Sequence, residues 1–373
     1  MNILVPLGTR PEIVKLAPVI TALSRRGHHV ITLATGQHYD ANLTDTFFDE
    51  LGIQPEIRWD LPAAESERVG VILTKALDVL AEQSPDLVVV LGDTYTVPLF
   101  CLAARRHQIP LVHVEAGLRS FNETSIEETN RKIAAASARF HFAPTPLAAR
   151  FLREEGVPEE RIRVVGNPVI DVLVGKGLTR VPADQRRGVL FTAHRPTNVD
   201  NPARLTDLVS IIERLSSEVG PVTFPVHPRT RARLLESGLW SRLESIDVTL
   251  CDPLPYEDLL SVLATSRVVV TDSGGLQEEA AFFGVPAIVL RRSTPRWEGV
   301  EQGVAALSGV DVERVLALAA HFAEAATLTY VAGAPCLYGD GTTSEQIADA
   351  LEDPAVLDLL PTREPDLTEW TPA

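Results

Sequence analysis

The sequence is poor in cysteine and in positive charge, and it has no long hydrophobic run. Its three cysteines, Cys101, Cys251 and Cys336, are far apart and form no Cys-x-x-Cys pair. An odd number of widely spaced cysteines argues against a disulfide framework and against a zinc site of the usual ligand spacing. We interpret these thiols as buried or incidental.

The charge balance and the absence of long apolar runs narrow the possible partners. The chain has 34 Lys and Arg against 50 Asp and Glu, a net charge of -16, which repels polyanions and argues against nucleic acid or an anionic membrane as partner. No apolar run approaches the roughly 18 residues of a spanning helix. Residues 1–7 are too short for a signal peptide and lack a basic start. We expect a cytoplasmic protein, in which an anionic ligand meets a local basic pocket.

The length and the order of apolar runs predict two domains of the α/β class. At about 150 residues per domain, 373 residues suggest two, and 45% apolar content can fill two cores. Short buried runs alternate with helical periods, which is typical of parallel sheets covered by helices. The predicted strands are 3–7, 30–33, 87–91 and 111–114 in the first series, and 189–193, 222–226, 268–272 and 287–290 in the second.

The domain boundaries follow from composition. We expect an N-terminal domain over 1–172 and a C-terminal domain over 187–342, with the polar stretch 171–188 as the linker. Residues 343–351 are predicted to be a helix returning to the N-terminal domain. The proline-rich stretch 353–373 is expected to be a trailing segment of doubtful order.

Polar residues directly follow the predicted strands in both series. In doubly wound sheets, ligands bind outside the carboxyl ends of the strands. Each residue alone could be a turn or a helix cap, and for Asp93 or Asp272 that interpretation is as good as a functional one. Their shared location favours a cleft between two Rossmann-like domains. The residues are Arg10, Asp93, Glu115, His194, Arg195, His227, Asp272 and Ser273.

Two further features suggest a phosphate ligand and acid–base chemistry. Ser273-Gly274-Gly275 precedes a helical pattern, where small residues let backbone amides approach a phosphate, although the same turn is also an ordinary cap. A carboxylate in the following first turn could accept ribose hydroxyls or complement the helix dipole. Asp93, Glu115 and Glu127 come from three loops and could present acid and base to a substrate, while Glu127-Glu128 could also be a solvated helix start.

Missing motifs argue against several classes of cofactor. The first turn holds only Gly8, so the GxGxxG fingerprint is missing, and no GxxxxGK[ST] loop occurs. This argues against bound NAD and against a P-loop NTPase. The sequence has no Asp-x-Asp pair that could cage magnesium. We therefore expect a site with no metal and no cofactor, where arginines, histidines and amides neutralise a pyrophosphate.

A series of motifs resembles the non-hydrolysing UDP-N-acetylglucosamine 2-epimerases. The matching stretches occur in family order over nearly the whole chain. Three of them, residues 8–12, 113–119 and 271–279, are together highly specific. They are Gly8-Thr9-Arg10-Pro11-Glu12, Thr35-Gly36-Gln37-His38, Gly92-Asp93-Thr94, His113-Val114-Glu115-Ala116-Gly117-Leu118-Arg119, Glu127-Glu128-Thr129-Asn130-Arg131, Gly166-Asn167-Pro168, His194-Arg195, Pro225-Val226-His227-Pro228, Thr271-Asp272-Ser273-Gly274-Gly275-Leu276-Gln277-Glu278-Glu279 and Tyr338-Gly339-Asp340-Gly341.

This resemblance implies a fold, a site and a partner. It implies a glycosyltransferase-B-like pair of Rossmann-type domains facing a cleft, a homodimer, and a UDP-sugar substrate. By matching positions, Asp93, Glu115, Glu127 and His194 would be catalytic, and Gln37 and His38 would be regulatory. The UDP-binding positions would be Arg10, His194, His227, Ser273, Gly274, Gly275, Glu279 and Arg296.

The implied activity is reversible 2-epimerisation of UDP-N-acetylglucosamine to UDP-N-acetylmannosamine through a 2-acetamidoglucal. Three alternatives stay open: a hydrolysing epimerase that releases UDP and N-acetylmannosamine, a transferase of the same architecture, and a non-enzymatic UDP-sugar sensor. Three loops depart from the family pattern. Thr197-Asn198 replaces a Glu-Asn pair, Thr294-Pro295-Arg296-Trp297-Glu298 replaces Thr-Glu-Arg-Pro-Glu, and Glu123 stands where relatives often carry a base. These departures suggest a specialised pathway acting on UDP-N-acetylglucosamine or a close derivative.

Overall fold

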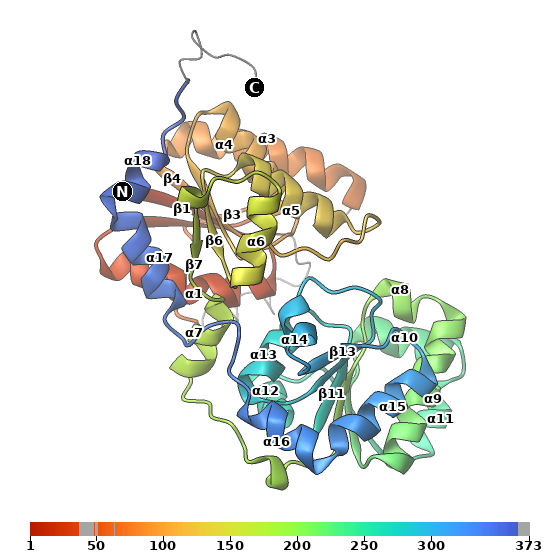
Figure 1. The fold of residues 1–373 in the computed structure, drawn as a ribbon. Helices are drawn as coiled ribbons and strands as arrows, with labels where there is room; N and C mark the ends of the chain where they lie inside the picture. The colour runs from red at the N-terminus through yellow and green to blue at the C-terminus, as the bar shows by residue number, and fades with distance from the viewer. Residues whose placement is uncertain (37–47, 49–50, 63, 365–373) are drawn as a thin grey trace, which may run out of the picture. The chain divides into compact units, whose positions relative to one another are not determined.

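The chain divides into two compact units, each built on its own parallel sheet (Figure 1). The computed structural model describes residues 1–36, 48, 51–62 and 64–364. Unit 1 comprises Met1–Leu118, Glu123–Pro168 and the chain from Thr342 onward. Unit 2 comprises Arg119–Asn122 and Val169–Gly341. The chain therefore changes unit at 168/169 and 341/342, and the short segment Arg119–Asn122 groups with unit 2.

Unit 1 contains a seven-stranded sheet in the order β3-β2-β1-β4-β5-β6-β7. All neighbouring pairs are parallel. The order reverses between β1 and β4, where Ile3 pairs with Leu87, and this is the switch point at which doubly wound sheets bind ligands. The strands are β1 Asn2–Leu7, β2 His29–Ala34, β3 Ile57–Arg58, β4 Leu87–Leu91, β5 Leu111–Val114, β6 Phe140–Ala143 and β7 Ile162–Val164.

The strands of unit 1 are apolar at consecutive positions because helices cover both faces. Ile3 and Val5 pack in one cluster with α1 and the C-terminal helices, whereas Leu4 packs on the other face with α3 and α4. The helices of this unit are α1 Arg10–Arg25, α3 Glu65–Gln83, α4 Thr96–Arg106, α5 Ile126–Ser137, α6 Pro146–Glu154, α17 Thr343–Glu352 and α18 Pro354–Leu359, with the short η1 Glu159–Arg161.

The end of the described chain is more ordered than its prolines suggested. Asp353 caps α18 by accepting a hydrogen bond from the amide of Ala355 at 3.0 Å. Val356 and Leu360 are buried in the unit 1 core with Ile347 of α17. The expectation of a trailing segment was therefore wrong for residues 354–360, because a cap and two apolar anchors fix them. In Figure 1 the helix α17, in blue, lies beside α1 in red, and α18 follows α17.

Unit 2 repeats the same winding with six strands in the order β10-β9-β8-β11-β12-β13, all parallel. Its switch point lies between β8 and β11. The strands are β8 Val189–Thr192, β9 Val222–Pro225, β10 Val248–Cys251, β11 Val268–Thr271, β12 Ala287–Val289 and β13 Ala305–Leu307. The helices are α7 Pro168–Gly175, α8 Pro196–Val199, α9 Pro202–Glu218, α10 Pro228–Glu236, α11 Trp240–Glu244, α12 Tyr256–Thr265, α13 Gly275–Phe283, α14 Trp297–Glu301, α15 Val312–Ala323 and α16 Ala325–Gly333, with η2 Ala183–Gln185.

The stretch predicted as a linker, residues 171–188, is fastened to unit 2. It begins inside α7, and two arginines tie its remainder down. Arg180 donates to the carbonyls of Phe282 and Ala332, each at 2.7 Å. The fully buried Arg186 donates to the carbonyl of Phe283 at 2.8 Å. Two arginines of the predicted linker therefore satisfy backbone carbonyls of unit 2.

The predicted α/β class with two doubly wound, Rossmann-like sheets is confirmed. Within the described part of the chain, no single helix is long and apolar enough to cross a membrane, and α15 with α16 meets that test only as a pair bent by 78°.

Candidate active site

A capping box joins the ends of β1 and β4 at the switch point of unit 1. Glu12, in the first turn of α1, accepts a hydrogen bond from the amide of Thr9 at 2.6 Å. Its other oxygen accepts from the hydroxyl of Thr94 at 2.9 Å. Burial raises the pKa of Glu12 to about 7, against the smaller opposing effect of these hydrogen bonds. Arg10 is the first residue of α1 and directly follows Thr9 of the capping box.

Asp93 directly follows β4 and is held by the first half of α5. Arg131 donates to its carboxylate and also to Glu128 at 2.6 Å, so one buried guanidinium bridges two acids. The amide side chain of Asn130 donates to the backbone carbonyl of Asp93 at 2.8 Å. The Asp93 side chain is still 31% exposed. This carboxylate is thus fixed in direction and accessible.

Glu115 follows β5 and carries a strained backbone. Its φ of 65° is left-handed, which is uncommon for a residue other than glycine and often marks a functional constraint. Its Oε1 accepts from Lys15 Nζ at 2.9 Å and from Asn167 Nδ2 at 3.1 Å. A Cβ added at Gly92 would lie 3.6 Å from Glu115 Oε2, so the Glu115 side chain reaches the turn that carries Asp93.

Glu127 is the second residue of α5 and is half-buried. The hydroxyl of Ser125 donates to its carboxylate. Its neighbour Glu128 is the acid bound by Arg131, so the same helix start carries Glu127 and fixes Asp93. The three predicted carboxylates therefore follow strands β4 and β5 at the carboxyl edge of one sheet, Asp93 and Glu115 in the turns after the strands and Glu127 at the start of α5.

In unit 2 a buried aspartate joins the ends of β8 and β11. Asp272 follows β11 and accepts hydrogen bonds from the amides of His194 at 3.1 Å and Arg195 at 2.9 Å. Asn198 adds a side-chain bond at 3.1 Å. Burial acts to raise the pKa of Asp272, but the bonds from His194, Arg195 and Asn198 outweigh it, so the pKa lies below its usual value. Asp272 thereby fixes the loop that carries His194.

Two histidines face each other next to this loop. The rings of His194 and His227 have centroids 5.8 Å apart. His227 caps α10, because its Nδ1 accepts from the amide of Arg229 at 3.2 Å. Burial, with smaller electrostatic contributions from the neighbouring His194 and Arg229, lowers the pKa of His227. His227 is therefore neutral at physiological pH, and it accepts at Nδ1.

The Ser273-Gly274-Gly275 turn begins α13 at the end of β11. Gly274 is the N-cap residue, and the hydroxyl of Ser273 accepts a hydrogen bond from the amide of Leu276 at 3.5 Å. A Cβ added at Gly274 would lie 3.3 Å from Arg296 Nη1, so the guanidinium lies directly over the turn. Arg296 is buried, and its Nε donates to Glu278 at 3.0 Å. Glu279 accepts from the Tyr256 hydroxyl at 2.7 Å. This turn combines helix-start amides with a fixed arginine, which suits a phosphate.

Comparison with known protein families identifies the family to which this chain belongs. A family model described as "UDP-N-acetylglucosamine 2-epimerase" matches residues 21–352. The chain belongs to the UDP-N-acetylglucosamine 2-epimerase family. Among its relatives, the UDP-N-acetylglucosamine 2-epimerase of Methanocaldococcus jannaschii is 37% identical over 85% of this chain and 90% of that protein.

Two further comparisons describe how other members of the epimerase family relate to this chain. The Pseudomonas aeruginosa protein named UDP-2,3-diacetamido-2,3-dideoxy-D-glucuronate 2-epimerase is 34% identical over 94% of this chain and 99% of that one. The crystal structure of the M. jannaschii epimerase in complex with UDP-GlcNAc and UDP has a TM-score of 0.83 and 34% identity, covering 94% of this chain and 99% of that one.

Sequence reasoning missed several residues that hold the epimerase carboxylates in place. Arg131 and Asn167 were inside the motifs named above, and Lys15 lies three residues after the first of them, but none of the three was given a role. Two signals were available: Thr9-x-x-Glu12 is a capping-box pattern, and Glu128 with Arg131 has the i,i+3 spacing of a helical ion pair. Two predicted regulatory residues, Gln37 and His38, lie outside the described residues.

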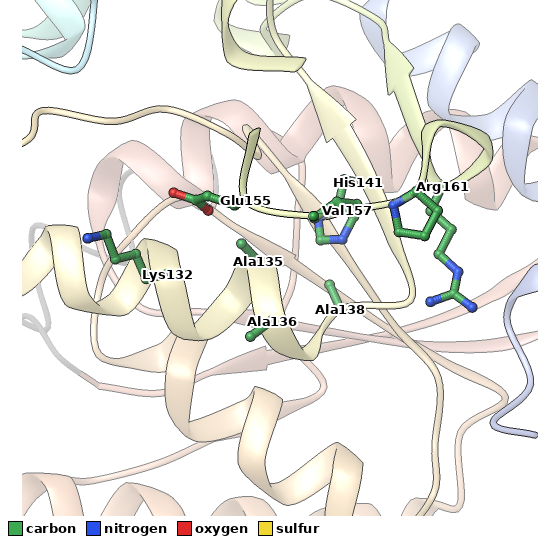
Figure 2. A pocket seen from close by; sticks show the side chains of 10 residues that line it. Lys132, Ala135, Ala136, Ala138, His141, Glu155, Val157 and Arg161 are labelled. Carbon is green, nitrogen blue, oxygen red and sulfur yellow. The ribbon is translucent and has the colours of Figure 1, made fainter. Parts of the chain in front are cut away.

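Unit 1 also contains a cavity of about 230 Å³ beside the last turns of α5 (Figure 2). It is lined by Lys132, His141, Glu155 and Arg161, with small residues of α5 and the turn after α6. Glu127 is in the first turn of the same helix, so this cavity lies at the opposite end of α5 from the carboxylates. Among the described residues, no group of three or more His, Cys, Asp or Glu side chains is placed to hold a metal ion.

Proposed function

We propose that this chain interconverts UDP-N-acetylglucosamine and UDP-N-acetylmannosamine by reversible elimination and re-addition of UDP. The observation that carries the proposal is the grouping of Asp93, Glu115 and Glu127 at one sheet edge in a chain of the 2-epimerase family. Family membership supports the substrate class, and the carboxylates support a proton transfer.

The chemistry requires acids near the sugar ring. The proton on C2 is not beside a carbonyl, so direct removal is slow. When the C1–O bond to UDP breaks, positive character at C1 makes this proton acidic. A carboxylate then removes it, the electron pair forms the C1–C2 double bond, and 2-acetamidoglucal and UDP result. Protonation of C2 on the opposite face and return of UDP to C1 give the manno product.

The residues of unit 1 suit the proton transfers. Lys15 supplies the counter-charge of Glu115, and Asn167 fixes its orientation, so Glu115 is a pre-aligned acceptor. Asp93 is held by Arg131 yet accessible, and Glu127 stands at the start of α5. We assign the two faces of C2 to carboxylates of this group.

The residues of unit 2 suit the leaving group. We propose that the Ser273-Gly274-Gly275 turn, Arg296 and the paired histidines hold the diphosphate, with Glu279 at the ribose. A helix start and a fixed guanidinium stabilise the negative charge that grows as UDP leaves. Because Asp272 fixes the His194 loop, this edge is organised without the ligand.

One observation favours a modified sugar as a second candidate substrate. The P. aeruginosa relative is named for a diacetamido-glucuronate nucleotide and matches over 99% of its length. The loops that depart from the family pattern, at Thr197, Glu123 and Trp297, lie in the stretches next to predicted site residues. Comparing kcat/KM for UDP-N-acetylglucosamine and for the diacetamido-uronate nucleotide decides between them. Efficient turnover of the plain sugar nucleotide removes the need for the derivative.

Product analysis separates the proposed reaction from its alternatives. With UDP-N-acetylglucosamine alone, we expect an equilibrium of two UDP-sugars and no accumulation of free UDP. A steady release of UDP and N-acetylmannosamine identifies the hydrolysing reaction, in which water captures the glycal. A requirement for an acceptor identifies a transferase, and binding without any turnover identifies a sensor.

A further inference from the structure

A short loop of the chain belongs to unit 2 although its flanking residues belong to unit 1. The crossing loop, Arg119–Asn122, groups with unit 2, whereas Leu118 and Glu123 group with unit 1. In sequence it lies between Glu115 and Glu127, two of the proposed catalytic acids. Three residues separate the loop from Glu115, and four separate it from Glu127.

The side chain of Trp297 anchors the crossing loop to unit 2. The indole Nε1 of Trp297 donates to the backbone carbonyl of Arg119 at 3.0 Å. Trp297 is the first residue of α14 and directly follows Arg296, the guanidinium that lies over the Ser273-Gly274-Gly275 turn. Arg119 is fully buried, whereas Phe121 is 61% exposed and has a left-handed φ of 55°. The bond from Trp297 is therefore made to the first residue of the loop, Arg119, whereas the third residue, Phe121, is exposed.

The connection between this anchor and Glu115 is stiff. Glu115 and Gly117 both have left-handed φ values, 65° and 86°. A Cβ added at Gly117 would lie 2.2 Å from the carbonyl oxygen of Ala148, so the backbone there is closely packed against α6. Such a segment has few alternative conformations between Glu115 and Arg119.

We propose that Trp297 is a positioning residue whose hydrogen bond to Arg119 fixes the crossing loop and thereby the placement of Glu115 and Glu127 for proton transfer. The proposal rests on the proposed function, because it assigns those acids to the reaction. The epimerase pattern that this chain resembles carries proline at this position, and proline has no side-chain donor. The anchor is therefore a feature of this chain's own sequence.

Two variants remove the anchor without removing α14. Trp297→Phe keeps an aromatic ring and deletes only the N–H donor. Trp297→Pro restores the residue of the family pattern, and proline suits the first position of a helix. Trp240→Phe is the matched control, because the indole of Trp240 also donates a hydrogen bond, to Glu244 at 2.7 Å, but on α11 away from the crossing loop.

The test combines a readout of the loop with a readout of the reaction in the full chain. In both Trp297 variants we expect faster amide hydrogen exchange in peptides covering residues 118–125. We also expect kcat to fall by about threefold to tenfold, the rate equivalent of one net hydrogen bond. UDP affinity and KM should stay unchanged, since the residues proposed to bind UDP are intact. Trp240→Phe should change none of these quantities.

The outcomes distinguish failure of this proposal from failure of the proposed function. If the wild-type chain converts no UDP-sugar, the proposed function is wrong, and amide exchange alone then decides whether Trp297 anchors the loop. If the wild-type chain is active and both variants keep its kcat, the positioning role is overturned, whatever their amide exchange. A fall in kcat with unchanged loop exchange also contradicts it, because the effect then acts elsewhere.

Discussion

Lys15 and Glu115 form a buried ion pair between α1 and the end of β5, with Nζ 2.9 Å from Oε1 and side-chain exposures of 6% and 5%. A pair this deeply buried is sensitive to the loss of one partner, because the remaining charge keeps its desolvation cost without compensation. The ion pair therefore links the stability of unit 1 to the orientation of a proposed catalytic acid.

Removing one member of this pair should destabilise the protein more than removing both. We expect Lys15→Met to lower the free energy of unfolding by about 3 to 5 kcal/mol. The double variant Lys15→Met with Glu115→Gln should recover part of that loss. Urea denaturation of the wild type, both single variants and the double variant measures the coupling. Strictly additive effects would show that the pair has no energetic coupling.

Glu12 should make stability fall as pH rises toward neutrality. The folded chain holds its proton up to about pH 7, whereas an ordinary glutamate releases it near 4.5. Between these values the folded state binds the extra proton, so this contribution to stability decreases with rising pH. Glu12→Gln keeps a capping side chain, and its stability advantage over the wild type should grow from pH 5 to pH 8.

The control for this measurement is Glu82→Gln, at an exposed position near the end of α3. Its stability difference from the wild type should stay constant over the same range. A constant difference for Glu12→Gln as well would contradict the assigned protonation of Glu12.

Asp272 should control UDP affinity through the His194 loop. Asp272→Asn replaces an oxygen that accepts backbone hydrogen bonds, and we expect about 1 to 3 kcal/mol of lost stability with weaker UDP binding. The lowered pKa of Asp272 means that its contribution is complete above its ordinary pKa and is lost as pH falls through the folded value. Calorimetric titration with UDP and urea denaturation at neutral and acid pH measure both effects.

Asp247→Asn, at an exposed position before β10, is the matched control and should bind UDP like the wild type. If Asp272→Asn binds UDP with wild-type affinity, the prediction that Asp272 controls UDP binding through the His194 loop is wrong.

Asp93 should matter for the chemical step and little for binding. Asp93→Asn preserves size and removes the charge, and we expect the rate to fall by about 100-fold to 10,000-fold, the usual range for a general acid or base. UDP affinity should be unchanged, because Asp93 is not among the residues proposed to bind UDP. Asp78→Asn, exposed on α3, is the control. A Michaelis constant that rises without a change in kcat would assign Asp93 to binding instead.

The sequence predicted the central strands well and missed the edge strands. Leu87–Leu91 and Leu111–Val114 were predicted at their observed bounds, because central strands buried on both faces are continuous apolar runs. Edge strands such as Ile162–Val164 are short and partly exposed, and they lack that signal. Phe140–Ala143 was also missed, although it is buried throughout and, like Leu111–Val114, contains a single histidine.

Part of the candidate site could also be predicted from the apolar runs. Acids that follow apolar runs, such as Asp93 and Glu115, can be found from position alone, since parallel strands end at one edge. Their partners cannot, because Lys15 and Asn167 reach Glu115 from 100 and 52 residues away. The hydrogen bond of Trp297 could not be predicted from the sequence either, because its partner is a backbone carbonyl 178 residues away.

The central claim is that carboxylates of unit 1 exchange the C2 proton of a UDP-sugar while UDP leaves and returns. The most direct measurement follows deuterium at C2 by NMR when UDP-N-acetylglucosamine is incubated with the protein in heavy water. The account predicts deuterium at C2 of both UDP-sugars at equilibrium, with the incorporation abolished in a variant lacking Asp93, Glu115 and Glu127. Conversion to the manno sugar with the original C2 hydrogen retained, or no incorporation at all, would contradict it.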